Sequence, residues 1–246
     1  MTVAALALVP GIAIGSFLNV VAARVPLRRS IVTPRSSCGS CAAPIAWYDN
    51  VPLLSYCALR GRCRACGVSI SSKYPAVELV TGLLVAGSVL AFGLTLRAVV
   101  ASLFCATLVA VSVTDLEHRL IPNRIVLPAV VVVLAAQTAA TGSPEWALAA
   151  IGASGFLLVA ALAYPAGMGM GDVKLALLLG AALGRTVAAA MMIAMVAALV
   201  PSIALLVRHG SAGRKMGIPF GPFLALGGVI ALFAGDAVLR TYFALY

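Results

Sequence analysis

The sequence has 246 residues, of which 63% are hydrophobic, with a mean hydropathy of +1.11 and a formal net charge of +10. Only 10% of the residues are charged, whereas about a quarter are charged in a soluble globular domain. A soluble fold cannot hide so much apolar surface from water, so the composition excludes a soluble enzyme and predicts a polytopic membrane protein.

Uncharged segments mark the expected membrane crossings. Each segment reaches or approaches the length of roughly 20 residues that is needed to cross a bilayer core. The segments are residues 1–23, 79–96, 98–114, 125–144, 146–171, 186–207 and 216–235. A shorter run, 175–184, becomes a span once its flanking residues are added. The sequence therefore predicts an all-α fold with about eight transmembrane helices. Residues 1–23 are expected to be a retained helix and not a cleaved signal, because the positive charge follows the apolar run at Arg24.

The basic residues are distributed unevenly along the chain. With the loop after residue 23 in the cytoplasm, only Arg97, Arg185 and Arg240 lie outside, as the positive-inside rule requires. Both termini are then outside, and the net charge is explained by topology and by membrane lipids as partners, not by nucleic acid. The inside loops hold the other basic residues: Arg24, Arg28, Arg29, Arg35, Arg60, Arg62, Arg64, Lys73, Arg119, Arg124, Lys174, Arg208, Arg214 and Lys215.

One soluble region interrupts the apolar chain. Residues 24–75 lie between the first helix, 1–23, and a transmembrane core, 76–246, and contain the pairs Cys38/Cys41 and Cys63/Cys66. Two such knuckles are typical of a tetrahedral zinc site. Two disulfides or four reduced thiols are the alternatives, and the cytoplasm disfavours disulfides. Four thiolates fill the zinc coordination sphere, so this metal is expected to be structural.

Two carboxylates are expected at one membrane depth. Asp115 ends the third span and Asp172 opens the sixth, both at the predicted cytoplasmic edge. Ionisable groups at membrane depth indicate function, and two close carboxylates share a proton, which is the chemistry of an aspartic protease and requires no catalytic metal. Gly167, Gly169 and Gly171 before Asp172 allow a peptide backbone to approach it, or form a flexible turn.

Several polar residues and two other functions stay open. Glu117 and the neighbouring His118 could either influence Asp115 or contact lipid headgroups, and headgroup contact is favoured. Lys174 could act as a charge partner of Asp172 or bind lipid phosphate. Glu78 could contact substrate or cap its helix. A transporter with cation-binding aspartates and a zinc-stabilised scaffold are the alternatives to a protease.

An ordered set of motifs resembles the type IV prepilin peptidases, membrane aspartyl proteases of the Gly-x-Gly-Asp class. The tetrad Gly169-Met-Gly-Asp172, with Lys174, is similar to the family's second catalytic motif, and Asp115, followed by Ile121-Pro-Asn123, to its first. The match covers nearly the whole chain, and its upstream segments are residues 15–21, 44–54, 60–67 and 72–79.

The resemblance implies a bacterial inner-membrane enzyme with its active site at the cytoplasmic face. Asp115 and Asp172 would cleave the basic leader of prepilins or pseudopilins after a glycine, in support of pilus assembly or type II secretion. Many family members then methylate the new N-terminal amine with S-adenosylmethionine, an activity associated with the cysteine-bearing loop. No residue is implied for the methyl transfer, and substrate-positioning roles are expected for Gly169, Gly171, Lys174, Glu117 and Glu78.

Overall fold

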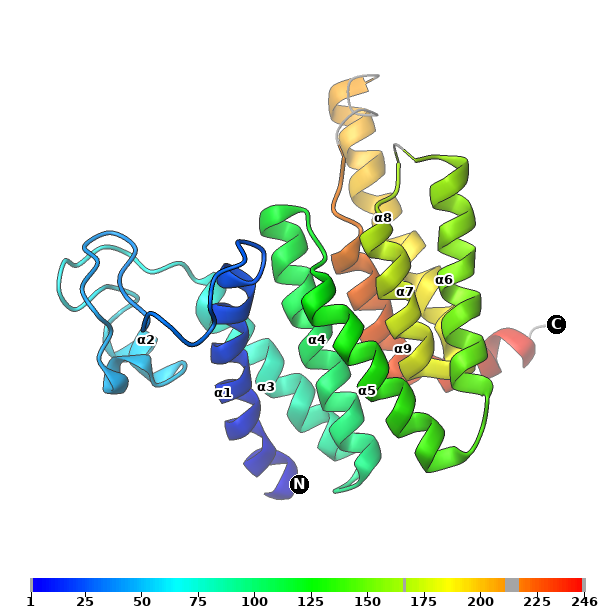
Figure 1. The fold of residues 1–246 in the computed structure, drawn as a ribbon, viewed down its shortest axis with the longest axis horizontal. Coiled ribbons are helices and arrows are strands. Elements are labelled where there is room, and N and C mark those ends of the chain that lie inside the picture. The colour runs from blue at the N-terminus through cyan, green and yellow to red at the C-terminus, as the bar shows by residue number, and fades with distance from the viewer. Residues whose placement is uncertain (1, 166, 211–216, 245–246) are drawn as a thin grey trace. The chain divides into compact units, whose positions relative to one another are not determined.

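The computed structural model describes residues 2–165, 167–210 and 217–244, and over these ranges the chain is helical, with two isolated β-bridges and no strand. The chain divides into two compact units, residues 1–110 and 111–246. Figure 1 shows the helices in chain order. The division predicted from sequence, at residues 23 and 75, stays a prediction.

The first unit contains a helix pair and the cysteine-bearing loop. Helix α1 (Thr2–Arg24) packs along α3 (Lys73–Phe92), and between them the loop carries only η1 (Trp47–Asn50) and α2 (Leu54–Ala58). Small residues allow the two long helices to approach closely. A Cβ atom added at Gly15 would lie 2.6 Å from Cα of Glu78. The end of α1 therefore lies directly against the start of α3.

The second unit is built around α7 (Met170–Leu183). This helix packs against each of the other long helices of the unit, and 10 of its 14 residues are buried. A Cβ atom at Gly180 would clash with the backbone of Ala149, so the glycine allows α7 to contact α6 closely. Its partners are α5 (Asn123–Thr141), α6 (Glu145–Ala163), α8 (Val187–His209) and α9 (Gly221–Ala244). Helix α4 (Leu96–His118) enters this unit with residues 111–118.

Seven segments of the described chain are long and apolar enough to cross a membrane. One of them, Met170–His209, has 40 residues and consists of α7 and α8, joined at the short helix η2 (Gly184–Thr186). Gly184 has a φ of +55°, a conformation that favours glycine. The described part of the chain therefore has eight long helices at the predicted places, in seven segments that can cross a membrane. With 14 residues, α7 is about 21 Å long and shorter than the roughly 30 Å bilayer core.

The helix boundaries differ from the predicted spans where charge alone was used to place them. Helix α6 ends at Ala163, before the predicted limit of 171, because Pro165 and the glycines after it do not continue a helix. Helix α3 begins at Lys73 and includes Glu78, although the predicted span starts at 79. The start of the predicted span 216–235, and the basic residues Arg214 and Lys215, lie outside the described residues.

Candidate active site and metal centre

The structure brings Asp115 and Asp172 together in the second unit. Asp115 lies in the last turn of α4 and Asp172 in the first turn of α7, and they are only 6% and 9% exposed. The two carboxylates are close enough for their charges to interact. Two buried carboxylates near each other do not ionise together easily, because each charge disfavours the other. The pair can therefore supply one basic and one acidic carboxyl group at the same place.

Asp115 is held by the start of α9. The backbone N–H of Gly221 donates a 2.9 Å hydrogen bond to Oδ2 of Asp115, and the charge of Arg119 also acts on this carboxylate. An N–H at a helix N-terminus carries part of the positive end of the helix dipole. Both contacts stabilise negative charge on Asp115.

Asp172 is held by its own helix. Gly169 is the N-cap of α7, and the carboxylate of Asp172 turns back to the backbone amide of this residue. This contact is half of a capping box, in which the third helical residue reaches the N-cap amide. A Cβ atom at Gly169 would meet only Asp172 and the backbone of Gly171 within 4 Å, so the space beside the carboxylate is open.

The other predicted site residues of the second unit have different environments. Gly171 lies against Ile121, since a Cβ atom there would be 2.9 Å from Cβ of Ile121; its small size allows α7 to pack closely against the segment between α4 and α5. Nζ of Lys174 donates a 2.9 Å hydrogen bond to Oδ1 of Asn123, the first residue of α5. Glu117 lies 4.0 Å from Nε2 of His118, and its side chain is 32% exposed.

The four paired cysteines form one cluster in the loop of the first unit. Their Sγ atoms all lie within 4.8 Å of one another, with Cys38 and Cys66 at 3.8 Å, and all six cysteines of the chain are free thiols. A tetrahedron with zinc–sulfur distances of about 2.3 Å has sulfur–sulfur edges of about 3.8 Å. The cluster therefore fits a tetrahedral metal ion. Backbone amides of Cys41 and Ser40 lower the pKa of the Cys38 thiol to about 6, which favours the thiolate that a metal ligand requires.

Two hairpins of the same construction carry these cysteines. Residues 36–45 align with residues 61–70 when the numbering is shifted by 25 positions, and each segment contains one of the isolated β-bridges. In both, the N–H of the first cysteine donates to the carbonyl five residues later, as the bonds Cys38 to Ala43 and Cys63 to Val68 show, each 2.9 Å long. This repeat is not evident from the sequence, because the hairpins share only the two cysteines and the final isoleucine.

Glu78 belongs to the same unit and lies near the start of α3. It is 8% exposed, and its Oε2 accepts a 2.8 Å hydrogen bond from the backbone N–H of Leu53. Leu53 has a φ of +58°, which is unfavourable for a residue with a side chain. The carboxylate of Glu78 therefore stabilises a strained turn of the loop, and it is not a cap of its own helix.

Gly221 was not among the residues singled out from sequence. The available signal was the segment Pro219-Phe-Gly-Pro222, in which two prolines flank a glycine directly before the last apolar run. Proline is favoured in the first turn of a helix, so the start of α9 can be predicted from the sequence. The contact between Gly221 and Asp115 cannot be predicted in this way, because the two residues are 106 positions apart.

The chain is similar to known proteins along most of its length. Residues 9–92 match the bacterial peptidase A24 N-terminal domain, and residues 102–205 match the type IV leader peptidase family. A Bacillus subtilis protein named prepilin leader peptidase/N-methyltransferase is 37% identical over 94% of each chain. A protein of the same name from Myxococcus xanthus is 40% identical, over 83% of this chain and 64% of its own length. Another from Pseudomonas aeruginosa is 35% identical, over 94% of this chain and 90% of its own length.

No solved structure matches the chain at a significant level. The two family matches lie in the expected order, and the B. subtilis relative is similar over nearly its full length. The chain therefore belongs to the type IV leader peptidase family.

Proposed function

We propose that the chain is a membrane-embedded aspartic endopeptidase that removes the basic leader from type IV prepilins or pseudopilins, cutting after a glycine. The observation that carries this proposal is the buried pair Asp115 and Asp172, whose charges interact within one compact unit. Family membership supports the substrate, since the relatives are named prepilin leader peptidases.

The pair can hydrolyse a peptide bond by general acid–base chemistry. Asp115, which accepts the Gly221 hydrogen bond, is the better holder of negative charge and takes a proton from water. The water oxygen attacks the carbonyl carbon of the scissile glycine, while Asp172 donates its proton to the carbonyl oxygen. When the carbon–nitrogen bond breaks, the proton on Asp115 passes to the leaving amine. Asp172 takes one hydroxyl proton back from the tetrahedral diol, which becomes the new carboxyl group, so the pair again holds one proton.

We further propose zinc in the cysteine cluster and S-adenosylmethionine as a second substrate. Cys38, Cys41, Cys63 and Cys66 would hold the metal, and with four thiolates it would stabilise the loop without activating water. S-adenosylmethionine would donate a methyl group to the N-terminal amine that cleavage creates, as the N-methyltransferase part of the relatives' name suggests. The proposed location is the bacterial inner membrane, with the active site at the cytoplasmic face.

Co-expression with a prepilin tests the peptidase proposal, with the substrate N-terminus analysed by mass spectrometry. Asp115→Asn and Asp172→Asn should each lower cleavage by about 10³-fold or more, and the double variant should be no worse, because the two groups act as a unit. Asp236→Asn is the matched control, since this carboxylate pairs with Arg185 at the far end of α9 and is half-exposed. Normal processing by a well-expressed Asp172→Asn variant would exclude the aspartic mechanism and favour a scaffold.

A further inference from the structure

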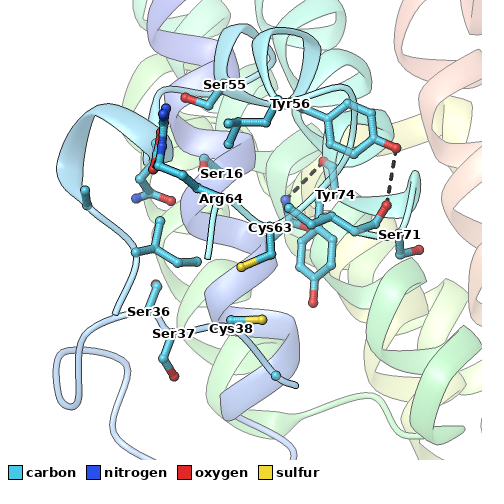
Figure 2. A pocket seen from close by; sticks show the side chains of 18 of the residues that line it. Ser16, Ser36, Ser37, Cys38, Ser55, Tyr56, Cys63, Arg64, Ser71 and Tyr74 are labelled. Carbon is cyan, nitrogen blue, oxygen red and sulfur yellow. Dashed lines mark hydrogen bonds and ion pairs between the residues drawn. The ribbon is translucent and has the colours of Figure 1, made fainter. Parts of the chain in front are cut away.

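A cavity of about 950 Å³ lies in the first unit, among the end of α1, the cysteine-bearing loop and the start of α3. Its volume is near the upper end of the range of about 300–1,000 Å³ that is typical of ligand sites. Figure 2 shows side chains from all three segments around it, including Ser16 of α1, Cys63 of the loop and Tyr74 of α3. The cavity can therefore hold more than one small group.

The cavity follows the end of a membrane-spanning helix. Its α1 wall runs from Ser16 to Arg24, which corresponds to about 12 Å along the helix axis. Because α1 is long and apolar enough to cross a bilayer, this wall reaches from the soluble loop into the edge of the membrane. A ligand that combines a polar end with an apolar chain in the bilayer can enter such a site.

One wall of the cavity carries a buried carboxylate without a counter-ion. Glu78 lines the cavity, and among the described residues no cation forms an ion pair with it; its hydrogen bond from Leu53 uses only Oε2. The other acid of the wall, Asp49, is neutralised by two 2.7 Å hydrogen bonds from Arg64. An unpaired buried carboxylate is unfavourable, so Oε1 of Glu78 is available to a cation supplied by a ligand.

The shape and chemistry of the site select the class of cation. A divalent metal ion would require several oxygen ligands with uncompensated charge, and Glu78 is the only unpaired carboxylate of this cavity among the described residues. Tyr56, Tyr74 and Leu53 give the site aromatic and apolar walls. An ammonium group at the start of an apolar chain satisfies both features.

We propose that this cavity binds the α-ammonium group of the newly cleaved substrate and that Glu78 is the base that prepares it for methylation. The proposal rests on the proposed function, because leader cleavage creates an ammonium group at the start of an apolar helix. It adds to that function an acceptor site in the cavity beside Glu78 and a catalytic role for Glu78.

The reaction is balanced with S-adenosylmethionine as the methyl donor. Glu78 takes one proton from the ammonium group, so an N–H bond breaks and an O–H bond forms on the carboxylate. The lone pair of the neutral amine then forms a bond to the methyl carbon of the donor, and the electrons of the carbon–sulfur bond remain on the sulfur. The products are a methylated ammonium group and S-adenosylhomocysteine, and Glu78 later releases its proton to water.

Binding of pre-cleaved pilin provides the first test, because it requires neither cleavage nor the methyl donor. The purified protein in detergent should bind mature pilin with a free N-terminal amine about tenfold tighter than the same pilin with an acetylated N-terminus. Glu78→Gln keeps an oxygen for the Leu53 N–H but removes the charge, so it should abolish this preference. Glu145→Gln, the same change at the first residue of α6, should retain it. An unchanged preference in Glu78→Gln would overturn the proposal.

Methyl transfer to pre-cleaved pilin provides the second test. Glu78→Gln should lower the initial rate by about 10²-fold, the usual contribution of a general base. A purely structural role is tested with Glu78→Ala combined with Leu53→Gly, since glycine adopts the positive φ of residue 53 without strain. If the double variant transfers methyl groups at the wild-type rate, Glu78 only supports the turn and the proposal is wrong. A wild-type protein that cleaves but never methylates would instead refute the methyltransferase part of the proposed function.

Discussion

The backbone N–H of Gly221 donates a 2.9 Å hydrogen bond to Oδ2 of Asp115, although 106 positions separate the two residues. A Cβ atom at residue 221 would lie only 2.7 Å from the same oxygen. The first turn of α9 can therefore hold this carboxylate at its N-terminus only because residue 221 has no side chain.

Gly221→Ala should separate α9 from Asp115 and lower prepilin cleavage by at least about tenfold, the effect of losing about 1.4 kcal/mol of transition-state stabilisation. The reason is steric, because the new methyl group displaces the carboxylate from the helix N-terminus. Cleavage rates of the purified variants measure this effect. Gly155→Ala is the matched control, since a Cβ atom there meets nothing within 4 Å. Equal rates for both variants would show that the Gly221 contact is dispensable.

The cysteine cluster should contain about one zinc ion per chain, as four thiolates imply. Changing Cys38 and Cys63 together to serine should remove the metal, which elemental analysis of the purified protein measures. Both cysteines line the large cavity of the first unit, so methyl transfer should be lost with the zinc. Cleavage should survive in part, because Asp115 and Asp172 belong to the second unit.

Cys57→Ser is the control for the zinc prediction. Cys57 is an exposed thiol of the same loop and is not one of the four clustered cysteines, so this variant should keep its zinc and both activities. A wild-type protein without any metal, or a Cys57→Ser variant that loses it, would contradict the assignment of the ligands.

The sequence predicted the features that depend on composition and short spacing. Uncharged runs located the eight helices, and the two-residue gaps of the cysteine pairs predicted their cluster, because both signals are local. Asp115 and Asp172 were paired by their expected depth in the membrane, and the structure places both in one buried site. Their catalytic role stays a prediction.

Contacts between distant residues were not predictable from the sequence. The bond from Leu53 to Glu78 depends on a positive φ in the loop, and no residue type there signals it, since leucine rarely adopts this conformation. The partner of Lys174 was also missed. Sequence offered Asp172 or lipid phosphate, whereas the structure shows Asn123, which the folding of α5 beside α7 brings within reach.

The two cysteine hairpins should differ in strain at one equivalent position. Ala42 and Gly67 follow the second cysteine of each pair, with φ values of +58° and +73°. A left-handed conformation costs a residue with a Cβ atom about 1–2 kcal/mol. Ala42→Gly should therefore increase resistance of the bound zinc to a chelator, and Gly67→Ala should decrease it. Changes of the same sign in both variants would show that φ does not control the stability of these hairpins.

The hydrogen bond between Lys174 and Asn123 joins the first turn of α7 to the first residue of α5. Lys174 follows Asp172 by two positions, so this bond should fix the orientation of the carboxylate. A hydrogen bond to a charged group contributes about 1.5–3 kcal/mol. Lys174→Met and Asn123→Ala should each lower the cleavage rate by about tenfold or more, with little change in KM.

A double-mutant cycle decides whether Lys174 acts through Asn123 or through lipid. If the bond between the two side chains is what matters, the double variant should be no slower than either single variant, because residues that share one interaction are not additive. Gln137→Leu is a control for a lost hydrogen bond between α5 and α7, since Gln137 donates to the carbonyl of Ala182 at the opposite end of α7. If Asn123→Ala cleaves normally while Lys174→Met is slow only in anionic liposomes, Lys174 binds lipid phosphate instead.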